Sequence, residues 1–304
     1  MQASEARQPF HIAEVGSNFG GDLQLAKTYI EEASKAGASA IKFQTLTKEK
    51  LLAQKTVIEG QLVDNPRWPL FGNVGLPEEW HQELKDHARA NGIQFASTPF
   101  YLEAVDVMEK CGVDFYKIAS GDITFLPLLE RVGATGKRVI LSTGASSLKE
   151  VDQALNTLRS AGASKVDLLH CVVSYPPQWA DMNLRAIATL KAEFGVDVGL
   201  SDHGPGYLAP VMAVALGGTI IEKHVTHDRG AKGPDHPFAM TFPEYAEMVQ
   251  QTKHATAALG TGIKVGTEDE LKRKHWFRRG TYDRNTGLPT AEGDLVWLRP
   301  EWKP

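Results

Sequence analysis

The stretch VDVGLSDHGPGYLAPVMAVALGGTIIEKHV, residues 196–225, carries the pattern that decides the fold. Apolar runs at 196–202 and 218–225 predict two short strands, and a Gly-Pro turn followed by a helical apolar pattern separates them. Polar side chains stand where the strands end, at 201–203 and 222–224. This order predicts parallel strands joined by a helix.

The same unit recurs about eight times along the chain. The apolar runs that predict strands occupy residues 9–16, 38–45, 93–99, 114–121, 138–144, 166–172, 196–202 and 218–225. Eight alternations with near-continuous apolar strands predict an α/β fold, a closed parallel TIM (β/α)8 barrel. An open, doubly wound sheet is the alternative, but no G-x-G-x-x-G follows the first strand, where GSNFGG (16–21) is only a loose match.

Two segments depart from this repeat. Residues 46–77 form a long irregular stretch, which we expect to be a functional loop over the mouth of the barrel. After the barrel, predicted to span residues 1–267, residues 268–304 are predicted to form a linker, which begins with a charged run, and a tail too short to bury its own core. We therefore expect the tail to pack on something else, such as a partner subunit.

The composition excludes several classes of function. The 33 basic and 37 acidic residues are well mixed and give a formal net charge of −4, so no basic face suited to nucleic acid is expected. The two cysteines are too few for a disulfide framework and lack a metal-binding spacing. The chain starts without an apolar signal core, and no apolar run approaches the roughly 18 residues of a membrane span. We expect a cytoplasmic protein that binds neither nucleic acid nor membrane.

Lys42 and Lys117 stand inside otherwise apolar predicted strands, where an unpaired ammonium group would be strongly unfavourable. They must face either a charged partner or a hydrated site. Structural salt bridges are one interpretation. Together with the hydroxyl groups of Ser120, Ser142 and Ser201, the lysines could instead bind a phosphate and a carboxylate of one small anionic molecule.

His203 and His224 occupy matching positions of adjacent predicted strands. A single strand histidine is more often a satisfied core residue than a ligand, but parallel neighbours at one height bring their side chains together. Two imidazoles with open positions suit a divalent transition ion such as manganese, and Asp202 or Glu222 could orient the rings. From the spacing alone, metal binding and a core role remain equally open.

Several motifs resemble one family over residues 9–300. They are IAEVGSNFGGD, AIKFQT, FASTPF, YKIASGD, VILSTGASS, LHCVVSYPPQWADMNL, GLSDHGPG, IIEKHVTHDRGAKGPDH and FRRG, in matching order and spacing. The chain is similar to the sialic acid (N-acetylneuraminate) synthases and their nonulosonate and spore-coat-polysaccharide relatives. The resemblance implies a barrel enzyme that condenses phosphoenolpyruvate with an open-chain sugar aldehyde, typically N-acetylmannosamine, and releases phosphate. It also implies a divalent metal, with manganese preferred over magnesium or cobalt.

The resemblance assigns roles to individual residues. It implies that His203 and His224 bind the metal, and that phosphoenolpyruvate is bound by Lys42, Lys117, Ser120, Ser142 and Ser201. The catalytic groups it implies are Asp122, which would help to activate water, with Glu14 and Lys117. The residues implied near the sugar are Glu14, Gln44, Tyr175, Asp235 and Arg299.

The chain differs from the family pattern at four places. Asp122 stands where many members have glutamate, which shortens the reach of the carboxylate. Phe19 replaces a histidine and Val173 a polar residue, and both changes are expected to remove hydrogen-bonding groups near the sugar pocket. The fourth difference is the C-terminus, where residues 295–304 match only the arginine-containing segment of an antifreeze-like domain.

The family's antifreeze-like domain reaches across a dimer and offers an arginine to the partner's sugar. We expect a homodimer in which a truncated arm delivers Arg299 to the partner subunit, anchored by Trp297 and Trp302. The alternative is that the arm has lost this function. Three alternatives stay open from the sequence. One is the same chemistry on a different, non-N-acetylated or shorter aldose, one is a pyruvate-dependent aldolase, and one is a barrel that binds sugar without catalysis.

Overall fold

The computed structural model describes residues 7–70 and 75–302. The chain divides into two compact units, Met1–Leu259 and Gly260–Pro304. The barrel strands of the first unit are β1 (Phe10–Glu14), β2 (Ala40–Thr45), β5 (Gln94–Pro99), β6 (Phe115–Ile118), β7 (Arg138–Ser142), β8 (Lys165–Cys171), β9 (Val198–Asp202) and β10 (Ile220–Thr226). Within the described residues these eight strands are parallel in chain order, and β1 pairs with β10. This closure confirms the predicted barrel.

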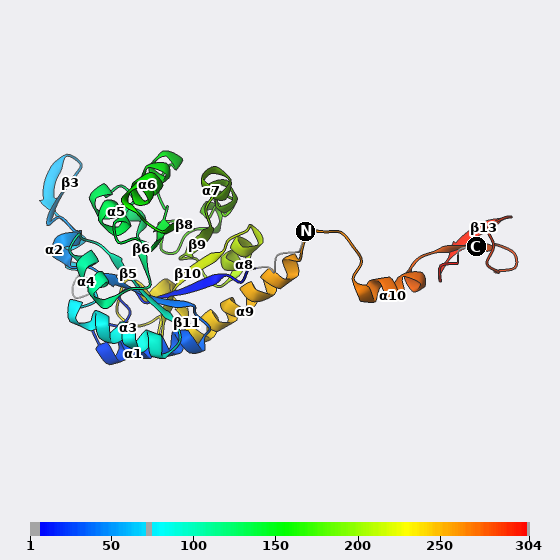
Figure 1. Ribbon diagram of the computed structural model, residues 1–304, viewed down its shortest axis with the longest axis horizontal. Helices are drawn as coiled ribbons and strands as arrows, with labels where there is room; N and C mark the ends of the chain where they lie inside the picture. The colour runs from blue at the N-terminus through cyan, green and yellow to red at the C-terminus, as the bar shows by residue number, and fades with distance from the viewer. Residues whose placement is uncertain (1–6, 71–74, 303–304) are drawn as a thin grey trace. The chain divides into compact units, whose positions relative to one another are not determined.

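A helix follows every barrel strand and covers the outside of the sheet (Figure 1). These helices are α1 (Leu23–Lys35), α3 (His81–Ala90), α4 (Ala104–Cys111), α5 (Leu126–Gly133), α6 (Leu148–Ala161), α7 (Ala186–Phe194), α8 (Leu208–Ala215) and α9 (Phe242–Leu259). The glycines that follow α4, α6 and α7 have positive φ angles, which favour glycine and end the helices before the next strand. None of the helices in the described part of the chain is long and apolar enough to cross a membrane.

The barrel interior changes from apolar to polar along the strands. Its amino-terminal part is filled by Ile12, Ala40, Ala96, Phe115, Ile140, Leu169 and Ile220. Because strand side chains alternate between the two faces, the next interior position lies two residues further on. On six of these strands that position holds a buried polar side chain, namely Glu14, Lys42, Thr98, Lys117, Ser142 and Glu222. A layer of apolar side chains in the barrel interior is therefore followed by a layer of polar side chains at the carboxyl ends of the strands.

Phe19, just after β1, belongs to the outer core between strands and helices. Its side chain is 0% exposed, and its ring centroid lies 5.9 Å from that of Phe43 and 6.3 Å from that of Trp80. Phe43 alternates with Lys42 on β2 and so points away from the barrel interior. The prediction that Phe19 borders the sugar pocket is therefore wrong, since the ring fills space beneath the helices.

The segment after β2 contains more regular structure than the sequence analysis predicts. It includes α2 (Lys48–Leu51) and an exposed antiparallel hairpin of β3 (Lys55–Ile58) and β4 (Gln61–Asp64). Glu59 and Gly60 connect the strands with φ angles of 50° and 78°, as a type I′ turn requires at its two central positions. Residues 71–74 of the predicted loop lie outside the described residues.

Short elements complete the first unit. They are the 3-10 turns η1 (Trp68–Leu70), η2 (Glu78–Trp80), η3 (Ser120–Asp122), η4 (Trp179–Asp181) and η5 (His236–Phe238), and β11 (Met240–Thr241), which extends the sheet beside β10. η3 and η5 follow β6 and β10, so both start from the carboxyl end of the barrel.

The second unit is small. It consists of α10 (Glu268–Phe277) and an antiparallel pair, β12 (Gly280–Asp283) and β13 (Leu295–Leu298). α10 coincides with the charged run that is predicted to be part of a linker, and a capping box of Thr267 and Glu270 begins it. Trp276 and Trp297 are 64% and 60% exposed. The unit thus buries little of its own apolar surface.

Candidate active site

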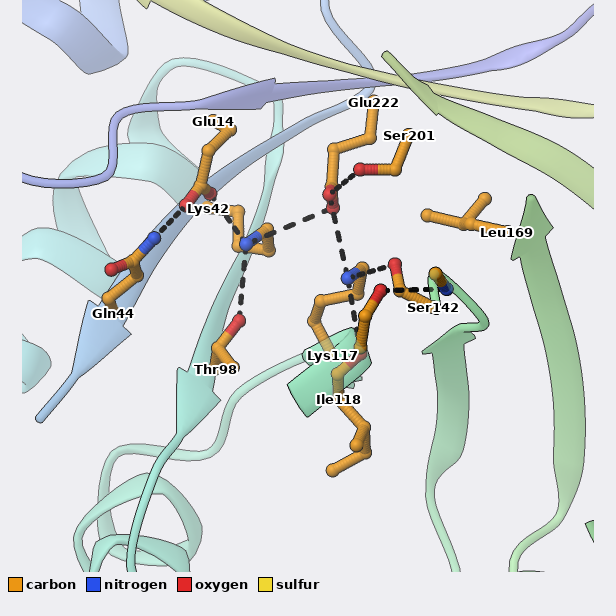
Figure 2. Close-up of polar contacts among 12 residues, drawn as sticks. Glu14, Lys42, Gln44, Thr98, Lys117, Ile118, Ser142, Leu169, Ser201 and Glu222 are labelled. Atoms are coloured by element: carbon orange, nitrogen blue, oxygen red, sulfur yellow. Dashed lines mark hydrogen bonds and ion pairs between the residues drawn. The ribbon is translucent and has the colours of Figure 1, made fainter. Parts of the chain in front are cut away.

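Four charged side chains alternate in sign inside the barrel (Figure 2). Lys42 Nζ lies 2.7 Å from Glu14 Oε2 and 3.8 Å from Glu222 Oε2, and Lys117 Nζ lies 3.5 Å from Glu222 Oε1. All four side chains are nearly inaccessible to solvent. We call Glu14, Lys42, Lys117 and Glu222 the inner cluster. Glu222 is its centre, because it is the carboxylate that both ammonium groups approach.

Neutral groups complete the hydrogen bonding of the inner cluster. Lys42 donates to Thr98 Oγ1 at 3.1 Å, and Lys117 donates to Ser142 Oγ at 2.7 Å and to the Ile118 carbonyl at 3.2 Å. Gln44 donates to Glu14 Oε1 at 2.8 Å, and Ser201 donates to Glu222 Oε1 at 2.9 Å. Side chains from seven barrel strands therefore meet in one network (Figure 2).

The inner cluster has a surplus of positive charge. Burial raises the pKa of Glu14 to about 7, although Lys42 opposes the shift. Burial acts in the same direction on Glu222, but Lys117 and Lys42 reverse the shift and lower the pKa of this carboxyl to about 2. Burial also lowers the pKa of Lys117, although Glu222 opposes the shift. Near neutral pH, Lys42 thus faces one ionised carboxylate, Glu222, and one that is partly protonated, Glu14. Such a site favours an added anion.

Glu222 is more central to the inner cluster than the sequence predicts, since this carboxylate is expected there only to support the histidines. The information was present in the sequence. Glu222 precedes His224 by two residues on one strand, which places both on the same face. Lys42 and Lys117 also require counter-charges of opposite sign, and a carboxylate on the same interior layer supplies one.

Hydroxyl groups gather next to Lys117. Ser120 Oγ accepts a hydrogen bond from the Gly144 amide at 3.0 Å, and Ser142 is already held by the ammonium group. A Cβ at Gly144 would lie 2.9 Å from Ser120 Oγ and 2.5 Å from Val173 Cγ2, so the close approach of these chains requires glycine. Val173 therefore lies beside the serines.

Asp122 comes from η3, just after Ser120, and is partly buried. Burial raises the pKa of this carboxyl to about 6, while the nearby charge of Lys117 opposes the shift. A carboxylate with this pKa is ionised near neutral pH and is also basic enough to accept a proton. The structure thus places a carboxylate of this basicity next to the lysine and serine side of the site.

His203 and His224 face each other at the ends of β9 and β10. Their ring centroids are 5.4 Å apart. His203 Nδ1 donates to the Val172 carbonyl at 3.2 Å, which leaves Nε2 as the lone-pair nitrogen of the neutral ring. Burial, together with the neighbouring His224, lowers the pKa of His203 to about 4, and burial also lowers the pKa of His224. Both imidazoles are therefore neutral, the form that binds a metal ion.

The histidine pair fits the donor set of an open metal site. His224 Nδ1 is buried and has no hydrogen-bond partner among the described residues. Within residues 7–70 and 75–302, no group of three or more His, Cys, Asp or Glu side chains is arranged to hold a metal. A bound ion would thus take two protein nitrogens and leave its other positions to water and substrate oxygens.

Two aromatic side chains cover the histidines. Phe238 of η5 has its ring centroid 4.9 Å from that of His224 and 5.7 Å from that of His203. Tyr175, which is 54% exposed, lies 4.3 Å from His203 and 5.3 Å from Phe238 by the same measure. Phe238 is a second residue that sequence reasoning misses, since it follows a loop of no recognisable periodicity.

The remaining sequence-predicted residues fall into three positions. Asp235 accepts hydrogen bonds from the Ser17 amide and hydroxyl, both at 3.1 Å, so it ties the loop after β10 to the loop after β1. Asp202 contacts Lys223 and the Gly204 amide. Its carboxylate therefore supports the backbone around His203 and not the imidazole ring. Arg299 is exposed in the second unit.

Comparison with known proteins identifies the family. A family model described as the NeuB family matches residues 29–264. N,N'-diacetyllegionaminic acid synthase of Campylobacter jejuni is 38% identical over 299 residues, which are 95% of this chain and 90% of that protein. An uncharacterized protein of Methanocaldococcus jannaschii is 45% identical over 261 residues, 86% of this chain and 75% of its own.

Solved structures agree with this result. The N-acetylneuraminic acid (sialic acid) synthetase of Leptospira borgpetersenii superimposes with a TM-score of 0.81 at 35% identity, covering 88% of this chain and 91% of that one. Truncated 3-deoxy-D-arabino-heptulosonate 7-phosphate synthase of Thermotoga maritima, at 16% identity and a TM-score of 0.65, shares the fold. The polar layer of the barrel, the sequence match over most of the chain and the structural match together show that the chain belongs to the NeuB family of sugar acid synthases.

Proposed function

We propose that this enzyme condenses phosphoenolpyruvate with an open-chain aldose and forms a 2-keto-3-deoxy sugar acid and inorganic phosphate. One observation carries the proposal. Two buried lysines, Lys42 and Lys117, lie beside several hydroxyl groups at the same carboxyl ends of the strands as a pair of neutral, facing imidazoles. The first part suits an anionic enol phosphate, and the second suits a group that polarises an aldehyde.

Phosphoenolpyruvate carries a phosphate and a carboxylate, and the inner cluster offers two ammonium groups. Lys117 and the hydroxyl groups of Ser120 and Ser142 form one side of the site, and Lys42 forms the other. Ser201, which donates to Glu222, can turn its hydroxyl toward the ligand. The contacts between the lysines and Glu222, at 3.5 and 3.8 Å, are longer than optimal ion pairs, so both ammonium groups can gain an anionic partner.

His203 and His224 would hold a divalent cation, for which we propose manganese, with magnesium or cobalt as alternatives. When bound, such an ion supplies Lewis-acid polarisation of a carbonyl oxygen. The protein's own contribution is to keep both rings neutral and to fix the tautomer of His203 through the Val172 carbonyl. Phe238 and Tyr175 shield the ring faces from solvent.

The proposed reaction forms one carbon–carbon bond and breaks one carbon–oxygen bond. The enol carbon of phosphoenolpyruvate supplies the electron pair to the aldehyde carbon, and the aldehyde oxygen takes up a proton to become a hydroxyl. Water adds to the resulting electrophilic carbon and gives one proton to Asp122. The C–O bond to phosphate then breaks, the leaving phosphate carries the bonding electrons away, and the proton of the added hydroxyl passes to phosphate. Over the whole reaction, one proton of the water thus balances the proton taken up by the aldehyde oxygen, and the other ends on phosphate. A ketone remains.

Glu14, Gln44, Tyr175 and Asp235 line the proposed sugar side of the mouth. Gln44 donates to Glu14 at 2.8 Å, so its amide oxygen stays available to accept from a sugar hydroxyl. We propose N-acetylmannosamine or a related sugar as the aldose, and a different or shorter aldose as the alternative. The legionaminic acid synthase among the relatives supports a nonulosonate product.

We also retain the proposal that the protein forms a homodimer in which the second unit contacts the partner subunit. The exposed Trp276 and Trp297 support this proposal, since the small unit leaves apolar surface uncovered. Arg299 would then reach the partner's sugar.

A phosphate-release assay tests the proposed function. The protein, manganese and phosphoenolpyruvate are incubated with a panel of N-acyl hexosamines, diamino-dideoxy sugars and shorter aldoses. We expect phosphate only when both metal and one suitable aldose are present, and His203→Ala should abolish turnover while the fold stays intact. If no aldose on the panel releases phosphate, the proposal is contradicted. Consumption of pyruvate in place of phosphoenolpyruvate would identify an aldolase.

A further inference from the structure

A second buried ion pair lies on the outer face of the barrel wall, one residue before the histidine pair. Lys223 of β10 and Asp202 of β9 are direct register partners. Each immediately precedes a histidine, His224 or His203. Because side chains alternate along a strand, the ion pair faces the helix layer while the imidazoles face the barrel interior.

The ammonium group of Lys223 holds two groups of the neighbouring strand end. Nζ lies 2.5 Å from Asp202 Oδ2 and also donates to the Gly204 carbonyl oxygen. Asp202 Oδ1 in turn accepts from the Gly204 amide at 2.7 Å. Lys223 is 1% exposed, so water does not compete for these contacts. We call Lys223, Asp202 and Gly204 the outer clip.

His203 depends on this clip more than His224 does. β10 continues to Thr226, and His224 pairs in register with Glu14 of β1, so its backbone is held within a strand ladder. β9 ends at Asp202, and the described ladder between β9 and β10 ends at the pair of Asp202 and Lys223. The residues on both sides of His203 are therefore held by one ammonium group, and its ring makes a single hydrogen bond, to Val172.

We infer that Lys223 is a positioning residue that sets His203 opposite His224. This inference rests on the proposed metal site and adds to it a residue on the far side of the barrel wall. His203 follows the last residue of β9, where no strand ladder fixes the position of the backbone. The outer clip supplies that constraint. Removing the ammonium group frees the Gly204 carbonyl and lets the peptide groups around His203 rotate.

The competing explanation is that the outer clip only stabilises the fold, and a matched ion pair elsewhere separates the two. Arg138 Nε lies 2.6 Å from Asp167 Oδ2 near the amino ends of β7 and β8, and Asp167 is fully buried. The carboxylate of Asp167 is as buried as that of Asp202 in the outer clip. The pair lies, however, at the opposite end of the strands from the histidines. Its loss should lower stability alone.

The experiment compares four proteins: wild type, Lys223→Met, the double variant Lys223→Met/Asp202→Asn, and the control Arg138→Met/Asp167→Asn. For each, calorimetry measures the affinities for Mn²⁺ alone and for phosphoenolpyruvate alone, and thermal unfolding gives Tm. We expect Lys223→Met to weaken Mn²⁺ binding at least about tenfold, as the loss of a partner behind a metal ligand does. Phosphoenolpyruvate affinity should change less than about twofold, since its proposed ligands are untouched.

The double variant is the decisive one. Lys223→Met leaves the carboxylate of Asp202 buried and unpaired, which lowers Tm, and Asp202→Asn removes that charge and restores part of the loss. Mn²⁺ affinity should stay low in the double variant, because the Gly204 carbonyl still lacks its donor. The control should lose Tm and keep its Mn²⁺ affinity. If Mn²⁺ affinity instead recovers together with Tm, the clip is merely structural and the inference is wrong.

A readout without metal separates this inference from the proposed function. Nitrogen-15 NMR of labelled imidazoles, assigned with His203→Ala, reports which ring nitrogen of His203 carries the proton. In wild type we expect the Nδ1–H form, and in Lys223→Met a mixture of both tautomers. If wild type does not bind Mn²⁺, the proposed metal site fails, and this measurement still decides the role of Lys223. A His203 spectrum unchanged in Lys223→Met would overturn it.

Discussion

The two faces of the barrel wall at β10 carry buried ionic networks of different character, although they lie one residue apart. On the inner face, Glu222 meets two ammonium groups at 3.5 and 3.8 Å, beside several hydroxyl groups. On the outer face, Lys223 meets one carboxylate at 2.5 Å and one backbone carbonyl. The contacts of Glu222 on the inner face are long, whereas those of Lys223 on the outer face are short.

The difference shows how one strand can serve both the site and the scaffold. A closed pair has satisfied its hydrogen bonds, so it fixes the geometry of the strands and has no capacity for a ligand. A loose cluster with surplus positive charge is incompletely satisfied and gains from an added anion. Substitutions on the inner face should therefore act on ligand binding directly, whereas substitutions on the outer face should act on stability and, through the backbone around His203, on the proposed metal site.

The largest effect is expected at Phe19, in the core between the barrel strands and the helices. Phe19→Ala removes a ring that is fully buried between Phe43 and Trp80, and should lower the free energy of unfolding by about 3–5 kcal/mol. The KM for the aldose should stay unchanged at temperatures where the variant is folded. Denaturant unfolding and steady-state kinetics measure the two quantities. Tyr175→Ala at the mouth is the control, with the opposite outcome. A raised aldose KM in Phe19→Ala would return this residue to the sugar pocket.

The next effect is on the inner face, at Lys117. Lys117→Met removes the ammonium group that contacts Ser142 and Glu222, and we expect a loss in kcat/KM for phosphoenolpyruvate of about 10²–10³-fold. Tm should fall little in comparison. Lys165→Met, at the amino end of β8 and 42% exposed, is the matched control and should keep full activity. Equal losses in both variants would show that the effect comes from the fold alone.

Asp122 should set the acidic limb of the pH profile. Its carboxyl has a pKa raised to about 6 by burial, and only the ionised form accepts a proton, so kcat should rise with pH through about 6 and then level off. Asp122→Asn should remove this limb and lower kcat about 10²-fold or more. If the limb near pH 6 persists in Asp122→Asn, it belongs to another group, of which Glu14, with a pKa raised to about 7, is the first to test.

The smallest effect is expected in the second unit. Arg299→Met should raise the KM for the aldose by up to about tenfold, equivalent to about 1.4 kcal/mol, and leave Tm unchanged. Arg284→Met is the control, because Arg284 is exposed in the same unit and pairs with Asp294 at 3.1 Å. Indistinguishable kinetics for the two variants would mean that the arm no longer serves the sugar site.

The barrel could be predicted from the sequence because its strands are continuous apolar runs separated by helices of clear period. The polar ends of these runs also indicated the mouth of the barrel, since parallel strands point the same way. The contacts between strands could not be predicted in the same way, because they depend on the register of the strands. The spacing from Glu222 to His224 placed both on one face, yet which residue of another strand lies opposite Glu222 depends on the tilt and closure of the whole sheet.

Other details were missed for local reasons. Phe19 follows β1 closely enough to be taken for a mouth residue, but a bulky aromatic side chain gains more from the outer core than from a polar pocket. The hairpin of β3 and β4 had a recognisable turn, Glu59-Gly60, between residues of high strand propensity, and the surrounding prolines obscured it. α10 had its capping box in the sequence, at Thr267 and Glu270.

The alternation along β10 also constrains which changes of length this protein can tolerate. Adding or deleting one residue between Ile220 and Thr226 would exchange the two faces from that point on, bringing Lys223 into the barrel interior and Glu222 or His224 under the helices. No single compensating substitution could restore both networks. A random insertion library should therefore be depleted at β10 and tolerant at the exposed hairpin of β3 and β4, even where point substitutions at both places are accepted.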